Sequence, residues 1–136
     1  MSNKKVAVAA CTGLDQPLGT VARKAGYQVL DKLRPEKTVL LCTPALIAGV
    51  KEDVVYAKEN PVLVIDGCEK ACCEKIVREI GGNVTGIMRI NDVQKQHGDL
   101  QPASRRRLGP EGEKLVEIVA KLAAEEVDRI LEKEKQ

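Results

Sequence analysis

Five cysteines offer the clearest chemistry in this sequence, because thiolates bind soft metal ions and exchange electrons. Three of them follow short apolar runs of the kind that form buried strands. They are Cys11 after residues 6–10, Cys42 after residues 39–41 and Cys68 after residues 62–67. In a parallel α/β sheet every strand ends at the same edge, and ligands bind in the crevice outside that edge. The sequence therefore predicts that three thiols far apart along the chain lie close together in space.

A fourth cysteine, Cys72, lies four residues after Cys68. If both belong to the start of one helix, their side chains share a helical face. The predicted cluster is therefore Cys11, Cys42, Cys68 and Cys72. Four thiolates satisfy a tetrahedral site, and sulfur ligands favour zinc, Cu(I) or iron–sulfur over hard cations such as magnesium. No Cys-x-x-Cys pair occurs, so the metal hypothesis depends on the predicted convergence of the strand ends.

Cys73 is predicted to pack in the core rather than to bind metal. It begins an i, i+3, i+4, i+7 apolar stripe that a helix turns toward the sheet. The stripe consists of Cys73, Ile76, Val77 and Ile80. Cys72 lies about 100° away around the helix, off this stripe. The alternative for the whole set is that all five cysteines are small core residues, since free cysteine is among the most buried residue types.

Asp66 and Gly67 separate the third apolar run from Cys68. The carboxylate of Asp66 is expected either to cap the following helix or to form a hydrogen bond within the site. Gly67 is expected to let the backbone approach a metal ion closely, because glycine has no side chain.

The elements that must position these residues alternate between short β-branched runs and longer amphipathic stretches, which is typical of a parallel sheet covered by helices. Strands are predicted at residues 5–10, 38–41, 62–65 and 84–90. Helices are predicted at residues 15–34, 43–48, 50–59, 69–80 and 110–136, with Thr43 capping the second. We therefore expect a single α/β domain over residues 1–136. Its fold is expected to be a three-layer α/β/α arrangement of Rossmann-like or flavodoxin-like type, with a four-stranded, mainly parallel sheet and a long C-terminal helix.

Residues 94–109 show no periodicity and many polar side chains, so we predict an exposed loop there that is long enough to form a functional flap. The last helix, predicted at residues 110–136, has apolar spacing from Pro110 to about Glu134, a length of about 36 Å at ~1.5 Å per residue, which exceeds the length of a small sheet. Its end is therefore expected to project or to pair with a second copy of the chain, giving a homodimer.

Composition narrows the classes of function. The 136 residues carry 22 Lys and Arg against 20 Asp and Glu, a formal net charge of +2, with 43% hydrophobic and 31% charged residues, which suits one globular domain. Trp and Phe are absent and Tyr27 and Tyr56 are the only aromatic residues, so nucleic-acid binding by base stacking is disfavoured. No apolar run reaches the roughly 20 residues that span a bilayer, and residues 1–5 are not expected to act as a signal peptide. We therefore expect a cytoplasmic protein, without membrane contact, whose odd number of cysteines stays reduced.

The other motifs in the sequence provide little evidence for a function. Neither G-x-G-x-x-G nor G-x-x-x-x-G-K-[ST] occurs, and Pro17 stands where the Cys-x5-Arg loop of low-molecular-weight phosphatases requires arginine. His97, the sole histidine, is expected on the surface of the predicted loop, with a general base or a fifth metal ligand as the alternatives. Residues 105–107 are three consecutive arginines. They are expected either to attract a phosphate or nucleic acid or to form a solvated turn.

The cysteine segments together resemble the DGC domain family. The resemblance rests on Asp66-Gly67-Cys68 followed by Cys72, on Cys11-Thr12-Gly13 with Gly19 downstream, and on Cys42-Thr43-Pro44-Ala45-Leu46. It spans roughly residues 5–92 and provides a counterpart for each of the four family cysteines. The resemblance implies zinc binding by Cys11, Cys42, Cys68 and Cys72, and it implies no particular reaction.

Three hypotheses follow. The leading one is a zinc-binding or soft-metal-binding protein, in which a closed four-thiolate shell serves a structural, sensing or metal-handling role and an open position permits Lewis-acid chemistry. The second is a thiol-dependent oxidoreductase without metal, which uses Cys11 with Cys42 or Cys68. The third is an interaction module that dimerises through its C-terminal helix. No catalytic residue and no substrate can be assigned from the sequence.

Overall fold

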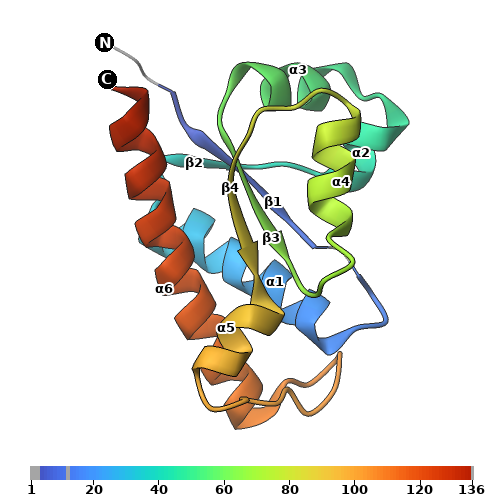
Figure 1. Cartoon of the computed structure of the whole chain (residues 1–136), viewed down its shortest axis with the longest axis vertical. Coiled ribbons are helices and arrows are strands. Elements are labelled where there is room, and N and C mark those ends of the chain that lie inside the picture. Colours follow the sequence, from blue (N-terminus) through green and yellow to red (C-terminus); the bar gives the residue numbers. More distant parts are fainter. Residues whose placement is uncertain (1–3, 12, 136) are drawn as a thin grey trace.

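Four short strands form one parallel sheet in a computed structural model that describes residues 4–11 and 13–135 (Figure 1). Met1, Ser2 and Asn3 of the opening segment and Thr12 of the Cys11-Thr12-Gly13 segment lie outside the described residues. The strand order is β2-β1-β3-β4. The strands are β1 (Val6–Ala10), β2 (Thr38–Leu40), β3 (Val62–Asp66) and β4 (Val84–Arg89). All three pairings are parallel, which confirms the predicted sheet.

The two central strands explain why their sequences are almost continuously apolar. Every residue of β1 and β3 is buried, because helices cover both faces of the sheet. Val6 and Val8 pack toward one face together with Leu63, while Ala7 and Ala9 pack toward the other. The prediction that the third apolar run forms a buried strand is confirmed, and β3 is a central strand of the sheet.

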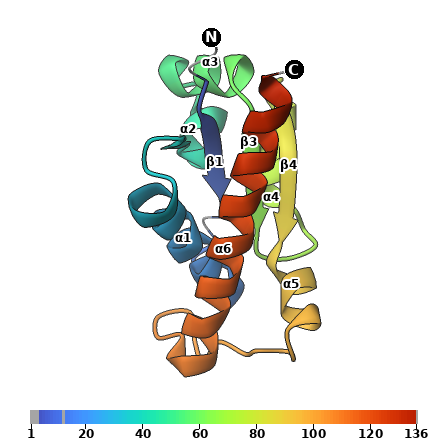
Figure 2. The ribbon, with the colours of Figure 1, turned by 90° about the vertical axis from the view of Figure 1, so that its left-hand side faces the viewer.

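Helices lie on both sides of the sheet and produce the predicted three layers (Figures 1 and 2). One face is covered by α1 (Pro17–Gln28), α5 (Ile90–Gln96) and α6 (Gly109–Glu134). The other face is covered by α2 (Thr43–Ala48), α3 (Lys51–Glu59) and α4 (Cys72–Glu79). The sheet is therefore packed between two apolar layers, and only its edges are available for chemistry.

The predicted loop over residues 94–109 is shorter than expected, because α5 continues to Gln96. Ile90 and Val93 are both buried, three residues apart, and join the core between α1 and α6. No glycine or proline separates β4 from α5, so the chain passes directly from strand to helix. The connection to α6 is therefore confined to residues 97–108.

The long helix α6 packs along the body of the molecule rather than projecting from it (Figure 2). Its buried residues extend from Gly112 to Ile130, and it packs chiefly against α1. At its end, Glu134 lies 3.6 Å from the ammonium group of Lys4. The expected projecting end is therefore not observed, and dimerisation through this helix stays a prediction. Within the described residues, no helix is both long enough and apolar enough to cross a bilayer.

A short π-helical segment, η1 (Val29–Leu33), follows α1 and leads to Arg34. The guanidinium of Arg34 donates from Nε and Nη2 to the two carboxylate oxygens of Asp128, at 2.8 and 2.7 Å. This bidentate pair joins the end of the first helical unit to α6. It lies near the amino-terminal edge of the sheet, away from the strand ends that precede the cysteines.

Candidate functional site

The four cysteines of the predicted cluster lie at the carboxyl-terminal edge of the sheet, here called the cysteine edge. Cys11 directly follows β1, Cys42 directly precedes α2, Cys68 lies two residues after β3, and Cys72 is the first residue of α4. Because β2, β1 and β3 are adjacent strands, the segments that follow them are neighbours along this edge. The chain runs from β1 outward to β2 and then returns past β1 to β3, so β1 and β3 flank the position where ligands bind in open α/β sheets.

The exposure of the cysteines differs along the edge. Cys42 and Cys72 are exposed, Cys11 and Cys68 are half-buried, and all five thiols of the chain are free. Among residues 4–11 and 13–135, no group of three or more His, Cys, Asp or Glu side chains is placed so that it could hold a metal ion. The donor set has the right chemistry for a soft metal, since it consists of thiols, but the sulfurs do not form a coordination shell in this conformation. Ligation by Cys11, Cys42, Cys68 and Cys72 stays a prediction.

The expected pairing of Cys68 and Cys72 on one helical face is wrong. We expected the helix to begin at Glu69, whereas α4 begins at Cys72. The residue before it, Ala71, has a left-handed backbone with φ of 54°, which a residue with a side chain adopts only at a cost. Cys68 therefore lies in the turn that precedes α4, and its position relative to Cys72 is set by that turn rather than by helical spacing.

Asp66 caps α4 from the end of β3. Its carboxylate accepts hydrogen bonds from the backbone N–H groups of Cys73 at 2.9 Å and Glu74 at 3.2 Å. The side chain is only 1% exposed, so these bonds satisfy a buried charge at the positive end of a helix. The prediction that Asp66 caps the following helix is confirmed. Asp66 thus holds the first turn of α4, which contains the two adjacent cysteines Cys72 and Cys73.

Cys73 faces the core, as predicted. Its side chain is 2% exposed, and burial raises the pKa of the Cys73 thiol to about 12, so the sulfur remains a protonated thiol. Its Sγ lies 3.6 Å from Oγ1 of Thr43, which also donates weakly to the carbonyl oxygen of Ala10 at 3.5 Å. Cys73 thus joins β1, α2 and α4 beneath the cysteine edge.

Thr43 has a different role from the one we expected. It is buried in the first turn of α2, where Cys42 is the residue at the cap position and no side-chain cap hydrogen bond forms. Its hydroxyl is instead directed at Cys73 and Ala10. The sequence pattern Thr-Pro indicates a helix start equally well when the threonine lies one residue inside the helix, so the pattern could not have revealed this contact.

Cys11 is held by its own loop. The backbone N–H of Gly13 donates to Cys11 Sγ at 3.3 Å, and the Cys11 side chain touches the apolar clusters on both faces of the sheet. Within residues 4–11 and 13–135, Cys11 is the candidate ligand whose sulfur accepts a hydrogen bond.

Two glycines allow the backbones around the cysteine edge to pack closely. A Cβ atom on Gly19 would lie 2.4 Å from the carbonyl oxygen of Gly13, and one on Gly67 would lie 3.0 Å from the carbonyl carbon of Leu18. The segments that follow β1 and β3 therefore pack through the first turn of α1. We expected Gly67 to permit close approach to a metal ion, and the structure gives it a backbone neighbour instead.

His97 and the arginine triplet lie on the connection between α5 and α6. His97 follows α5 directly and its side chain is exposed, as expected. The side chains of Arg105, Arg106 and Arg107 are also exposed, in a turn whose backbone is held to α1 through Thr20. The sequence marked this triplet but could not indicate which helix it would face.

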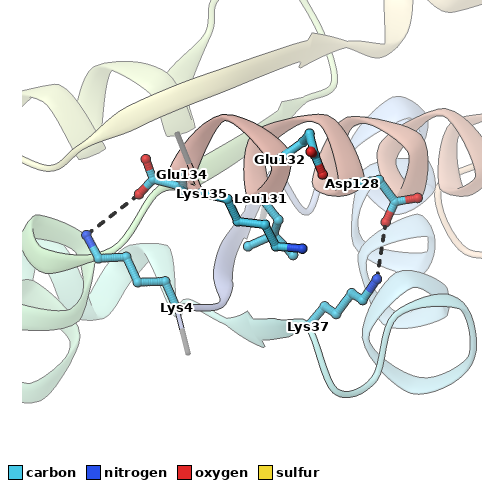
Figure 3. Close-up of a pocket in the computed structure, with 7 residues that line it drawn as sticks. All are labelled: Lys4, Lys37, Asp128, Leu131, Glu132, Glu134 and Lys135. Carbon is cyan, nitrogen blue, oxygen red and sulfur yellow. Dashed lines mark ion pairs between the residues drawn. The ribbon is translucent and has the colours of Figure 1, made fainter. Parts of the chain in front are cut away.

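A pocket of about 270 Å³ at the opposite end of the sheet is no rival site (Figure 3). Its lining contains four acidic and basic side chains that pair with one another, Lys4 with Glu134 and Lys37 with Asp128, as the dashed lines in Figure 3 show. Asp128 also pairs with Arg34, so these side chains are engaged in ion pairs at the surface. None of its lining residues is a cysteine.

Comparison with known proteins gives one result. A sequence model described as the DGC domain matches residues 7–119, which include all five cysteines. No curated protein and no solved structure matches the chain significantly.

Proposed function

The chain belongs to the DGC domain family, and we propose that it binds a zinc ion, or a similarly soft metal ion, through Cys11, Cys42, Cys68 and Cys72 in the cytoplasm. The observation that carries the proposal is the division among the five cysteines. Four free thiols lie at or next to the surface along one edge of the sheet, whereas the fifth, Cys73, is buried. Full burial in the core accounts for Cys73 alone, whereas Cys42 and Cys72 are exposed and Cys11 and Cys68 are half-buried.

The proposal requires the sulfurs to move together when the ion binds. Cys11 is held between the two apolar clusters, so it forms the fixed side of the site. Cys68 lies in the turn over residues 67–71, which contains the left-handed Ala71 and connects β3 to α4. A movement of this turn toward Cys11 brings Cys68 closer to it, and the free energy of metal binding offsets the cost of rearranging the turn.

The role that suits such a site is metal handling, metal sensing or stabilisation of the fold. Four thiolates close the coordination shell of zinc and leave no position for a substrate. Exposed Cys42 and Cys72 give a metal ion a route to and from solvent. If one of the four does not ligate, the open position lets the metal activate a bound water or thiol as a Lewis acid.

The titration of reduced, metal-free protein with Co²⁺, followed by competition with Zn²⁺ under anaerobic conditions, tests the proposal. Thiolate ligation produces a sulfur-to-cobalt charge-transfer absorption, which zinc then abolishes. We expect the band to weaken and the affinity to fall at least tenfold in each of Cys11→Ser, Cys42→Ser, Cys68→Ser and Cys72→Ser, as loss of a ligand requires. Cys73→Ser is the matched control and should retain the band. A spectrum without charge-transfer absorption contradicts the proposal.

A metal-free thiol oxidoreductase is the second candidate, and one observation favours it. The N–H of Gly13 donates to Cys11 Sγ, which helps an attacking thiolate at the ligand-binding position of the sheet. In this reaction Cys11 and Cys42 or Cys68 form a disulfide, and their two electrons and two protons convert a disulfide substrate into two thiols. A Cys11→Ser variant that loses reduction of a model disulfide, in protein shown to be free of metal, would support this candidate over metal binding.

A further inference from the structure

A hollow of about 560 Å³ lies between α1 and the connection over residues 97–108, and it has no part in the proposed metal site. Its lining includes four cationic side chains, one acidic side chain and one hydroxyl: Arg23, Lys24, Arg105, Arg106, Asp15 and Thr20. Figure 1 shows the connection, in orange, passing beneath the start of α1, in blue. We call this feature the basic hollow.

A structured turn holds two of the cations in place. The backbone N–H of Ser104 donates to the carbonyl oxygen of Arg107 at 3.0 Å, and the N–H of Arg107 donates back to Ser104 Oγ at 3.0 Å. Arg105 and Arg106 are the two residues between them, at the tip of the turn. The N–H of Ala103 also donates to the carbonyl oxygen of Leu108 at 2.8 Å. The tip is therefore part of a hydrogen-bonded turn and not a free stretch of chain.

A hydrogen bond from Thr20 connects this turn to α1. Its side chain is 3% exposed, and its hydroxyl donates to the carbonyl oxygen of Arg105 at 2.6 Å, across 85 residues of sequence. Arg23 and Lys24 lie one turn further along the same helix. A single buried hydroxyl thus brings the arginine turn against the two cations of α1.

The positive charges of the basic hollow are largely uncompensated. Lys24 lies 2.8 Å from Glu113, but the side chains of Arg23, Arg105 and Arg106 have no ion pair or hydrogen bond with any residue that the structure describes. Four positive charges therefore face two negative charges, those of Asp15 and Glu113. Like charges brought together repel one another, and the repulsion is relieved when an anion binds among them.

We infer that the basic hollow binds a phosphate-type oxyanion carried by a small molecule. Guanidinium groups recognise such oxyanions through pairs of parallel hydrogen bonds, and three unpaired arginines converge here. The volume of the hollow lies within the range of small-molecule sites. No aromatic side chain lines it, so base stacking gives a single-stranded nucleic acid no advantage over a small anion.

Isothermal titration with pyrophosphate, inorganic phosphate and glycerol phosphate, at matched ionic strength, tests the inference and separates a free anion from a phosphate ester. We expect saturable binding that the double variant Arg105→Gln/Arg106→Gln weakens by about tenfold or more, since a hydrogen bond to a charged group has that magnitude. Arg107→Gln is the matched control. It removes the same charge from the same turn but from a side chain that does not line the hollow, so its effect should stay within about twofold.

Thr20→Val tests whether the turn must be held in place. The substitution removes the hydroxyl and leaves every charge, so a merely electrostatic surface would bind pyrophosphate unchanged. We expect binding to weaken by about tenfold, with the circular dichroism spectrum retained. Circular dichroism also verifies the fold of the double variant, whose exposed side chains are not part of the core.

Three results would overturn the inference. They are the lack of saturable binding of all three anions by the native chain, an equal loss in Arg107→Gln and the double variant, and tighter binding of an oligonucleotide than of pyrophosphate through the same arginines. Metal content is unaffected by any of these outcomes, because no cysteine lines the basic hollow.

Discussion

The carboxylate of Asp66, at the end of β3, accepts a hydrogen bond of 2.9 Å from the backbone N–H of Cys73, in the first turn of α4. In this turn Cys73 enters the core, on the same apolar face of α4 as Val77, and Cys72 remains exposed at the cysteine edge. Asp66, which ends β3, thus holds the turn of α4 in which the candidate metal ligand Cys72 lies.

Asp66→Asn should destabilise the protein by about 1–3 kcal/mol, because it removes a buried charge from two N–H donors and turns an amide donor toward one of them. Urea unfolding followed by circular dichroism measures the change. Glu52→Gln is the matched control, since Glu52 is an exposed acidic residue in the first turn of α3. Its effect should stay below about 0.5 kcal/mol, within the usual range for surface substitutions. Equal losses in the two variants would contradict the capping role of Asp66.

Gly19→Ala should cost about 1–3 kcal/mol, the usual range for overpacking, because the added methyl group would meet the carbonyl oxygen of Gly13 at 2.4 Å. The clash is with a backbone atom, which cannot rotate away as the end of a flexible side chain can. The whole segment that carries Cys11 and Gly13 therefore has to shift. In the control, Gly13→Ala, the methyl group meets only Cys11 Sγ, at 3.4 Å, and should have a smaller effect. Thermal unfolding compares the two, and a Gly13→Ala variant less stable than Gly19→Ala would refute the packing described.

Pulsed alkylation of the reduced, metal-free protein should modify Cys72 far faster than Cys73. The two are adjacent in sequence, but Cys72 is exposed whereas Cys73 is 2% exposed and reacts only when the structure opens. Cys42, which is also exposed, should be alkylated about as fast as Cys72. The half-buried Cys11 and Cys68 should be alkylated more slowly. Peptide mass spectrometry resolves the order. If Cys73 is modified as rapidly as Cys72, the assignment of Cys73 to the core is wrong.

The ion pair between Arg34 and Asp128 should make stability depend on pH in the acidic range. Hydrogen bonds from Arg34 hold the pKa of the Asp128 carboxyl below its ordinary value. A group whose pKa is lower in the folded state contributes its stability above the unfolded pKa, about 3.9, and loses it as the pH falls through the folded-state pKa. The difference in unfolding free energy between native protein and Asp128→Asn should therefore be constant from about pH 5 to 7 and shrink below about pH 4.

Asp31→Asn provides the control for this pH dependence. Asp31 is an exposed carboxylate in η1, and among the residues described it has no ion pair or hydrogen bond through its side chain. Urea unfolding at a series of pH values compares the two variants with the native chain. A difference for Asp128→Asn that grows as the pH falls would show that the pair does not stabilise the fold.

Much of this architecture could be predicted from the sequence, because it depends on local patterns. The continuous apolar run of β3 and the stripe that begins at Cys73 specify burial directly, and the cysteines after β1, β2 and β3 must share an edge once the sheet is parallel. The predicted helical pairing of Cys68 with Cys72 failed because α4 begins at Cys72, after the left-handed Ala71, rather than at Glu69. Asp66 caps this helix from the end of β3, six residues before Cys72. The helical periodicity of the apolar residues does not indicate such a contact.

The basic hollow illustrates the same limit. The arginines at positions 105–107 are conspicuous in the sequence, but their partners on α1 lie about 80 residues away and are selected by the buried hydroxyl of Thr20. Likewise, the close approach at Gly19 depends on the path of the backbone near Gly13, which no local pattern encodes. Contacts between distant segments had to come from the structure.

Metal content tests the central claim most directly. The chain and its single Cys→Ser variants are purified reduced, without added metal, and zinc per chain is measured by elemental mass spectrometry before and after anaerobic reconstitution. The account predicts close to one zinc per chain in the native protein and in Cys73→Ser, and its loss in variants of Cys11, Cys42, Cys68 and Cys72. A native chain that takes up no metal even after reconstitution would contradict the account.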